Sequence, residues 1–164
     1  MQKGMISPLR LTTGVAQLEE LAMTQSIALN STTNSATVFS TSAAVVGRIF
    51  LSAIFILSGV SKITAPAGMI GYIESVGLPF PTLALALAIL VELAGGVALI
   101  LGYRTRLVAA GLAAFTVVTA LAFHNQLGDQ NQFIHFFKNI AMAGGLLQVL
   151  AFGAGRFSLD ARRG

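Results

Sequence analysis

The chain of 164 residues contains no cysteine and no tryptophan, and only 10% of its residues are charged. The lack of cysteine excludes disulfide bonds, CxxC redox exchange, thiolate metal sites and cysteine nucleophiles. Soluble domains carry about 25% charged residues, so the scarcity of charge excludes an ordinary water-soluble globule. Any electron transfer would therefore need a bound cofactor, a substrate or a partner protein.

Hydrophobic residues make up 55% of the chain, and most of them gather in long runs after residue 42. Each run is close to the roughly 20 residues that a helix needs to cross the hydrocarbon core of a membrane. A core helix of a soluble protein would be shorter or would carry a charged face. The sequence therefore predicts an all-α integral membrane four-helix bundle, whose spans cover residues 43–61, 82–101, 107–123 and 134–153.

Residues 1–42 differ in composition from the rest of the chain. The stretch from Thr24 to Ser42 is mostly Ser, Thr, Asn and Ala without a sustained period. Such composition is typical of a flexible segment, and no run in residues 1–30 resembles the apolar part of a secretion signal. We therefore expect a polar, disordered N-terminal tail, followed by a membrane domain over residues 43–160.

The basic residues outside the spans favour one side of the membrane. Lys62 lies alone on one side, whereas the other side collects Lys3, Arg10, Arg104, Arg106, Arg156, Arg162 and Arg163. Cytoplasmic segments carry the excess of Lys and Arg, so both termini are expected in the cytoplasm. The formal net charge of +4 is small and scattered, without basic runs interleaved with aromatic residues, and gives no indication of nucleic-acid binding.

Three charged residues lie inside the predicted spans, namely Arg48, Glu92 and Lys138. Each costs about 2.5 to 3.5 kcal/mol near the middle of a membrane helix, so each needs a partner, a water-filled cavity or a functional role. Glu92 is the deepest, at about 15 Å from either end of its span. Its expected partners are Arg48 on the cytoplasmic side and Lys62 or Lys138 on the outer side. A structural ion pair and a ligand-binding role both fit Arg48 and Glu92.

The first span places its polar and small residues on one stripe, because they follow a 4, 3, 4, 3 spacing: Arg48, Ser52, Phe55, Gly59 and Lys62. If such stripes face the interior of the bundle, they surround Glu92 with hydrogen-bond donors at several depths in the membrane. The candidate ligand-binding pocket comprises Arg48, Lys62, Glu92, His124, Lys138 and Asn139. His124 and His135 also fit interfacial anchors, and without nearby carboxylates they predict no metal site.

Several of these residues lie in an ordered set of motifs. The set comprises Arg48, SGVSKI at Ser58 to Ile63, GLPFP at Gly77 to Pro81, VELAGGVALILGYRTR at Val91 to Arg106, and GAGRFSLD at Gly153 to Asp160. In this order the motifs resemble the DoxX family of small four-helix membrane proteins. The resemblance covers residues 43–160 and leaves out residues 1–42.

The resemblance implies a multi-pass protein of a bacterial-type inner membrane, in a group often described as oxidoreductases. The family is named after a subunit of a thiosulfate:quinone oxidoreductase. Other members are linked to quinone or catechol reduction and to oxidative-stress complexes, and many have no assigned role. The recurring polar positions of the family fall on Arg48, Lys62 and Glu92, with His124 as a weaker match. No catalytic role travels with these positions, and the absence of cysteine separates the chain from four-helix thiol-redox enzymes such as vitamin K epoxide reductase.

Two classes of function follow. The first is a membrane component of a quinone-linked oxidoreductase system, with a soluble or membrane oxidoreductase as partner and a quinone as the exchangeable cofactor. Quinone reduction needs donors to two carbonyl oxygens and a proton source, which the candidate pocket contains. No motif for haem, iron-sulfur or dinucleotide binding occurs, so no cofactor bound covalently is expected. The alternative is a non-catalytic scaffold, assembly factor or small-solute carrier.

The charge asymmetry generates a topology prediction. Reporters fused after Arg10 and at Gly164 should be active only as cytoplasmic fusions, whereas a reporter inserted near Gly128 should be active only outside the membrane. Paired alkaline phosphatase and fluorescent protein fusions measure both. An external C-terminal reporter would contradict the even number of spans.

Overall fold

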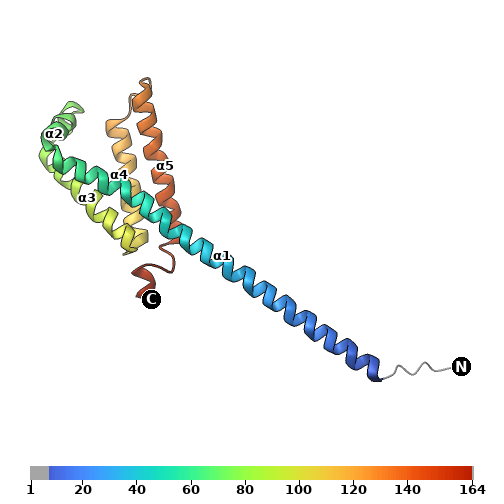
Figure 1. Cartoon of the computed structure of the whole chain (residues 1–164). Coiled ribbons are helices and arrows are strands. Elements are labelled where there is room, and N and C mark those ends of the chain that lie inside the picture. The colour runs from blue at the N-terminus through green and yellow to red at the C-terminus, as the bar shows by residue number, and fades with distance from the viewer. Residues whose placement is uncertain (1–7, 164) are drawn as a thin grey trace. The chain divides into compact units, whose positions relative to one another are not determined.

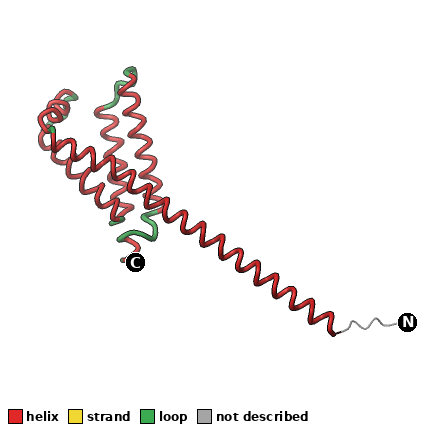
Figure 2. The backbone as a smooth tube through the Cα atoms, viewed as in Figure 1, coloured by secondary structure: helices red, strands yellow, loops and turns green. Residues whose placement is uncertain are grey.

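The computed structural model describes residues 8–163, and it is helical with short connections (Figure 1). No strand occurs in this range, as the backbone tube also shows (Figure 2). The helices are α1 (Pro8–Thr64), α2 (Pro66–Ser75), α3 (Pro81–Leu101), α4 (Thr105–Phe123) and α5 (Gln130–Phe152), followed by the short 3-10 helix η1 (Asp160–Arg162).

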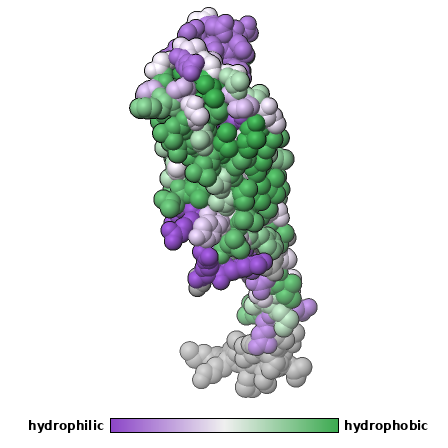
Figure 3. Space-filling model, turned by 90° about the vertical axis from the view of Figure 1, so that its left-hand side faces the viewer, coloured by the Kyte–Doolittle hydropathy of each residue, from purple (hydrophilic) through white to green (hydrophobic). Residues whose placement is uncertain are grey.

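Four of the described helical segments are long and apolar enough to cross a membrane, which confirms the predicted bundle. They are Val38–Thr64, Pro81–Leu101, Thr105–Phe123 and Gln130–Phe152. The last begins four residues before its predicted start at residue 134, because Asp129 caps the helix by accepting the Gln132 N–H at 2.9 Å. On the face drawn in Figure 3, apolar side chains cover the bundle between hydrophilic residues at its two ends.

The chain divides into two compact units, Met1–Ser40 and Thr41–Gly164, close to the predicted boundary after residue 42. In the first unit α1 is helical from Pro8 onward, over a stretch predicted as a disordered tail; residues 1–7 of that tail lie outside the described residues. Hydroxyl groups there donate to carbonyls of the preceding turn, at 2.8 Å each: Thr24 to Glu20, Ser26 to Met23 and Ser31 to Ala28. This bonding leaves the helical backbone intact, which is how a Ser- and Thr-rich stretch forms a helix.

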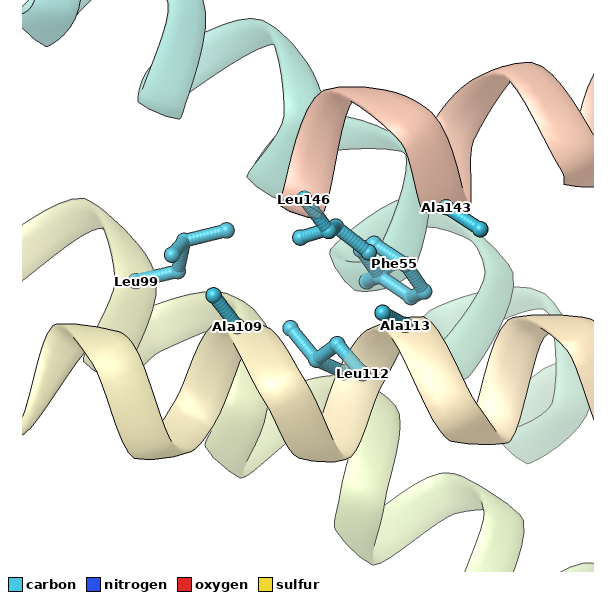
Figure 4. Packing of buried hydrophobic residues seen from close by; sticks show 7 residues of the cluster. All are labelled: Phe55, Leu99, Ala109, Leu112, Ala113, Ala143 and Leu146. Atoms are coloured by element: carbon cyan, nitrogen blue, oxygen red, sulfur yellow. The ribbon is translucent and has the colours of Figure 1, made fainter. Parts of the chain in front are cut away.

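In the second unit, α1, α3, α4 and α5 meet in one apolar core (Figure 4). The core consists of Phe55, Leu99, Ala109, Leu112, Ala113, Ala143 and Leu146. Alanines at three of these positions bring the helix backbones together, and the larger side chains fill the space between them. Because lipid chains are as apolar as this core, its contribution comes from van der Waals packing rather than from removal of water.

Glycines allow the closest helix contacts of the bundle. A Cβ added at Gly96 of α3 would lie 2.8 Å from the Ile56 side chain and 3.3 Å from the Ser52 carbonyl of α1. Gly95 faces Leu112 of α4 at 2.8 Å by the same measure. Gly144 of α5, in contrast, has open space around it. The distances of α1 and α4 from α3 therefore depend on glycine, whereas Gly144 has no such role.

At the end of the bundle that carries residues 153–163, called the C-terminal end below, Arg48 ties three segments together. Its guanidinium is 2% exposed, and it donates to the carbonyl of Phe157 at 2.7 Å and, more weakly, to that of Leu99 at 3.5 Å. A Cβ at Gly102 would collide with this guanidinium, and Gly102 also has the left-handed φ of 67° that ends α3. Arg48 thus joins α1 to the end of α3 and to the C-terminal segment.

Asp160 completes this arrangement by capping α4. Its carboxylate accepts the backbone N–H groups of Arg104 at 2.7 Å and Thr105 at 2.8 Å. Its own N–H donates to the Gly102 carbonyl at 2.9 Å. These backbone hydrogen bonds, that from Thr105 first, hold the pKa of Asp160 below its ordinary value of 3.8.

The glycine contacts predict unequal tolerance of a large side chain. Gly96→Leu should destabilise the bundle by several kcal/mol, about 3 or more, because the Ser52 backbone cannot move away and the half-buried Ile56 side chain fills the remaining space. Gly144→Leu is the matched control, and it should leave thermal stability in detergent nearly unchanged. Equal effects of the two substitutions would show that α3 does not approach α1 as closely as described.

The Asp160 cap predicts a pH-dependent effect. Asp160→Ala should lower the free energy of unfolding by about 1 kcal/mol near pH 7, because two helix N–H groups lose their acceptor. The pKa of Asp160 is lowered on folding, so its contribution is complete above the unfolded value of 3.8 and is lost as pH falls through the folded value. Thermal unfolding of both proteins over a range of pH measures this, and a constant difference down to the most acidic point would contradict it.

Candidate functional site

An ion pair joins α1 to α3 within the membrane span. The Lys62 ammonium donates to both carboxylate oxygens of Glu92, at 2.8 and 2.9 Å. Ser58 donates to Oε1 of Glu92 at 3.1 Å and accepts from Lys62 at 2.7 Å. The side chains of Lys62 and Glu92 are only 16% and 7% exposed. The three residues form a closed network in which each charge has a partner.

The local sequence explains this geometry. Ser58 and Lys62 are four residues apart and therefore share one face of α1. Gly59 lies beside them, and a Cβ there would lie 2.8 Å from the Leu93 side chain, so the missing side chain lets α3 come close. Lys62 belongs to the last turns of α1, and its long aliphatic stem allows the ammonium to reach the carboxylate along the helix.

Beside the ion pair lies a cavity of about 240 Å³. Its walls come from α1, α3, α4 and α5, and from the residue that follows α4. The lining residues are Ile54, Phe55, Leu57, Ser58, Glu92, Phe115, Thr116, Thr119, His124, His135, Lys138, Asn139 and Met142. One part of the lining is apolar and the other carries hydroxyl, imidazole, amide, carboxylate and ammonium groups.

Two histidines form one polar wall of the cavity. The His124 and His135 rings stack with centroids 5.1 Å apart. His124 Nδ1 lies 2.8 Å from Oε1 of Gln132, and Lys138 Nζ lies 2.9 Å from Nδ1 of His135. With the Gln132 oxygen accepting and the Lys138 ammonium donating, His124 keeps a free acceptor at Nε2 and neutral His135 a free N–H at Nε2. The stacked pair thus combines one acceptor with one donor.

Asn139 and Thr119 keep hydrogen-bonding capacity for a ligand. The Asn139 amide donates to the His135 carbonyl of its own helix at 3.0 Å, and the Thr119 hydroxyl donates to Thr116 at 2.9 Å. Their side-chain oxygens remain as acceptors. Glu92 and Lys62 balance each other in formal charge, so Lys138 leaves the cavity with an excess of positive charge. This set of groups can hold a small ring compound with oxygen substituents.

The structure brings most of the predicted site residues together and leaves one apart. It brings Glu92, His124, Lys138 and Asn139 to the same cavity, and it pairs Lys62 with Glu92. Arg48 lies elsewhere, since it contacts Leu99, which follows Glu92 by seven residues, or about 10 Å along α3. Of the expected partners of Glu92, Lys62 is therefore the one in contact.

Four polar residues of the cavity were not among the predicted site residues: Ser58, Thr116, Thr119 and His135. The spacing of four between Ser58 and Lys62 is a signal that could have identified Ser58. His135 precedes Lys138 by three residues, which also places the two on one helix face. Thr119 has no comparable signal. No cluster of three or more metal-ligating side chains occurs within the described part of the chain.

Comparison with known proteins gives matches over the same region. The model of the DoxX family matches residues 43–125. Inner membrane protein YqjF of Escherichia coli strain K12 is 38% identical over 115 residues, which cover 70% of this chain and 87% of YqjF. Inner membrane protein YphA of the same strain is 34% identical over 122 residues, covering 71% and 87%. No solved structure gives a significant match.

The ion pair predicts which basic residue depends on Glu92. Glu92→Gln should lower the free energy of unfolding by about 3 kcal/mol, because it leaves the Lys62 charge without a carboxylate. Adding Lys62→Gln should recover most of this loss, whereas adding Arg48→Gln, the control, should only add its own cost. Thermal unfolding of the single and double variants in one detergent measures these values. Recovery with Arg48→Gln instead would show that Arg48, and not Lys62, is the partner of Glu92.

Proposed function

Because the chain belongs to the DoxX family and is a multi-pass inner-membrane protein, we propose that it is the membrane component of a quinone-linked redox system. In this proposal the cavity beside Glu92 holds the head group of a quinone, and a partner oxidoreductase supplies the electrons. The observation that supports it most is the cavity itself, which combines a polar wall with apolar residues inside the membrane-spanning bundle.

The size of the cavity fits a head group of one ring. Pockets for drug-sized ligands occupy about 300 to 1,000 Å³, and this one is smaller, at about 240 Å³. Phe55, Phe115 and Met142 provide apolar surface for the ring, and other lining residues provide the polar groups. A quinone carbonyl needs a hydrogen-bond donor and the quinol hydroxyl needs an acceptor, and the stacked histidines combine both.

Reduction of a quinone to a quinol takes two electrons and two protons. In the proposal a reduced partner of the flavin or haem class delivers the electrons, because the chain has no cysteine to oxidise. His135 donates its Nε2 proton to one ring oxygen, the second proton comes from water, and Nε2 of His124 accepts from the quinol hydroxyl that forms. Water then restores the proton to His135. The Lys62–Glu92 pair positions α1 against α3 and thereby shapes the cavity.

Quinone binding tests the proposal. Protein purified in mild detergent should carry a quinone that organic extraction and chromatography detect, and added quinone should raise the thermal unfolding temperature. Asn139→Leu should weaken binding at least about tenfold, because it removes a polar lining group and fills the cavity. The fold should persist, since Asn139 bonds only to its own helix among the described residues.

Asn125→Leu is the matched control, because Asn125 is exposed and does not line the cavity. It should bind quinone as the unchanged protein does. If quinone neither copurifies with the protein nor shifts its unfolding temperature, the proposed function is wrong. Equal weakening by both asparagine substitutions would place the quinone outside this cavity.

A further inference from the structure

The interfaces between neighbouring helices, called seams below, determine how a ligand reaches the cavity. The α1–α3 seam is closed by the Lys62–Glu92 pair and by the contact of Gly59 with Leu93. The α3–α4 seam is closed where Leu112 packs on Gly95. At the level of these contacts a ligand therefore cannot pass between α3 and either neighbour without separating packed side chains.

The α4–α5 seam is closed at the level of the cavity by the histidine wall. His124 bonds to Gln132 and stacks on His135, so the residue after α4 is joined to two residues of α5. These contacts lie at the end of the bundle where the polar connection of residues 124–129 leaves α4. They separate the cavity from that connection.

The α1–α5 seam differs. It is closed at one level, where a Cβ at Gly145 would lie 3.2 Å from the Leu51 side chain. In Figure 1 the two helices run close together at the C-terminal end and diverge toward the end that carries α2. The cavity lies along this diverging part, since its lining begins at Ile54 on α1 and at Met142 on α5.

Exposure of the lining residues locates the opening. The lining residues on α3 and α4 are buried or half-buried, whereas Ile54 and Leu57 of α1 are 39% and 67% exposed. On α5 the exposed lining residue is Lys138. The rim of the cavity therefore consists of two apolar side chains on one side and an ammonium on the other.

This rim lies within the membrane. Leu57 precedes the end of α1 at Thr64 by seven residues, or about 10 Å, and Lys138 follows the start of α5 at Gln130 by eight residues, or about 12 Å. Both distances place the rim at the depth of lipid chains rather than of water. An opening here admits a molecule that is dissolved in the bilayer.

We propose that the gap between α1 and α5, bounded by Ile54, Leu57 and Lys138, is a lateral portal through which an amphiphile enters the cavity from the membrane. The polar head group passes Lys138 and reaches the histidine wall, and the apolar chain stays outside against Ile54 and Leu57. The inference rests on the proposed function for the nature of the head group, and it adds the route and the requirement for an apolar tail.

The absence of cysteine makes the portal directly testable. In a Leu57→Cys variant the introduced thiol is unique and can be alkylated with a bulky apolar maleimide in the membrane. The control is Leu147→Cys, because Leu147 is 54% exposed on α5 and does not line the cavity. Binding of two compounds is then measured in lipid nanodiscs: a quinone with an isoprenoid tail and the same head group without the tail.

Alkylation at position 57 should slow the association of both compounds at least about tenfold, because both enter through the portal, and it should weaken the affinity more for the tailed quinone, whose tail stays in the portal. Alkylation at position 147 should change neither. Unchanged association of both compounds after alkylation at position 57 would overturn the portal, and an equal loss of affinity for both would show that the tail does not lie against Leu57. If neither compound binds the unmodified protein, the proposed function fails and this inference fails with it.

Discussion

The bundle depends on how one carboxylate is satisfied in a medium without water. Glu92 is 5% exposed and lies in the middle of α3, where an unpaired charge would cost several kcal/mol. Among the described residues, Lys62 and Ser58 donate the hydrogen bonds that Glu92 accepts, and both come from α1. The requirement for a partner therefore sets the register of α1 against α3. The glycines at this interface match that register, and the cavity lies on the far side of the same carboxylate.

Buried charge is stabilised in two different ways at two levels of the bundle. At the level of Glu92 two opposite charges meet, whereas at the C-terminal end Arg48 is surrounded by carbonyl dipoles of Leu99 and Phe157. Carbonyl groups accept from two nitrogens of the guanidinium, whereas its buried Nε has no hydrogen-bond partner among the described residues. The Lys62 charge is paired with Glu92 beside the proposed ligand site, and the Arg48 charge is held by carbonyl dipoles where the chain ends.

The sequence predicts the spans and the inward face of α1 well, because long apolar runs and a spacing of three and four residues each have one structural solution. It predicts that Glu92 has a basic partner and names Lys62 with Arg48 and Lys138 as candidates, but it does not decide among the three. Depth calculated from helical rise places Lys62 at the helix end, and it ignores the length of the lysine stem and its direction along the helix. Asn139 and Lys138 could be recognised as polar residues within a span. Their position in one cavity with His124 depends on the packing of α4 on α5, which no local pattern encodes.

The contact between Arg48 and Phe157 joins residues that are 109 positions apart. At a synthesis rate of about 5 to 20 residues per second, the ribosome needs about 5 to 20 seconds after making Arg48 before Phe157 exists. Throughout this time the first span carries a cation whose shortest hydrogen bond cannot form. The bundle therefore closes only once the last residues of the chain have been made. A chain released before Phe157 leaves the Arg48 guanidinium without its shortest hydrogen bond, so this one side chain distinguishes a chain that includes Phe157 from a shorter one.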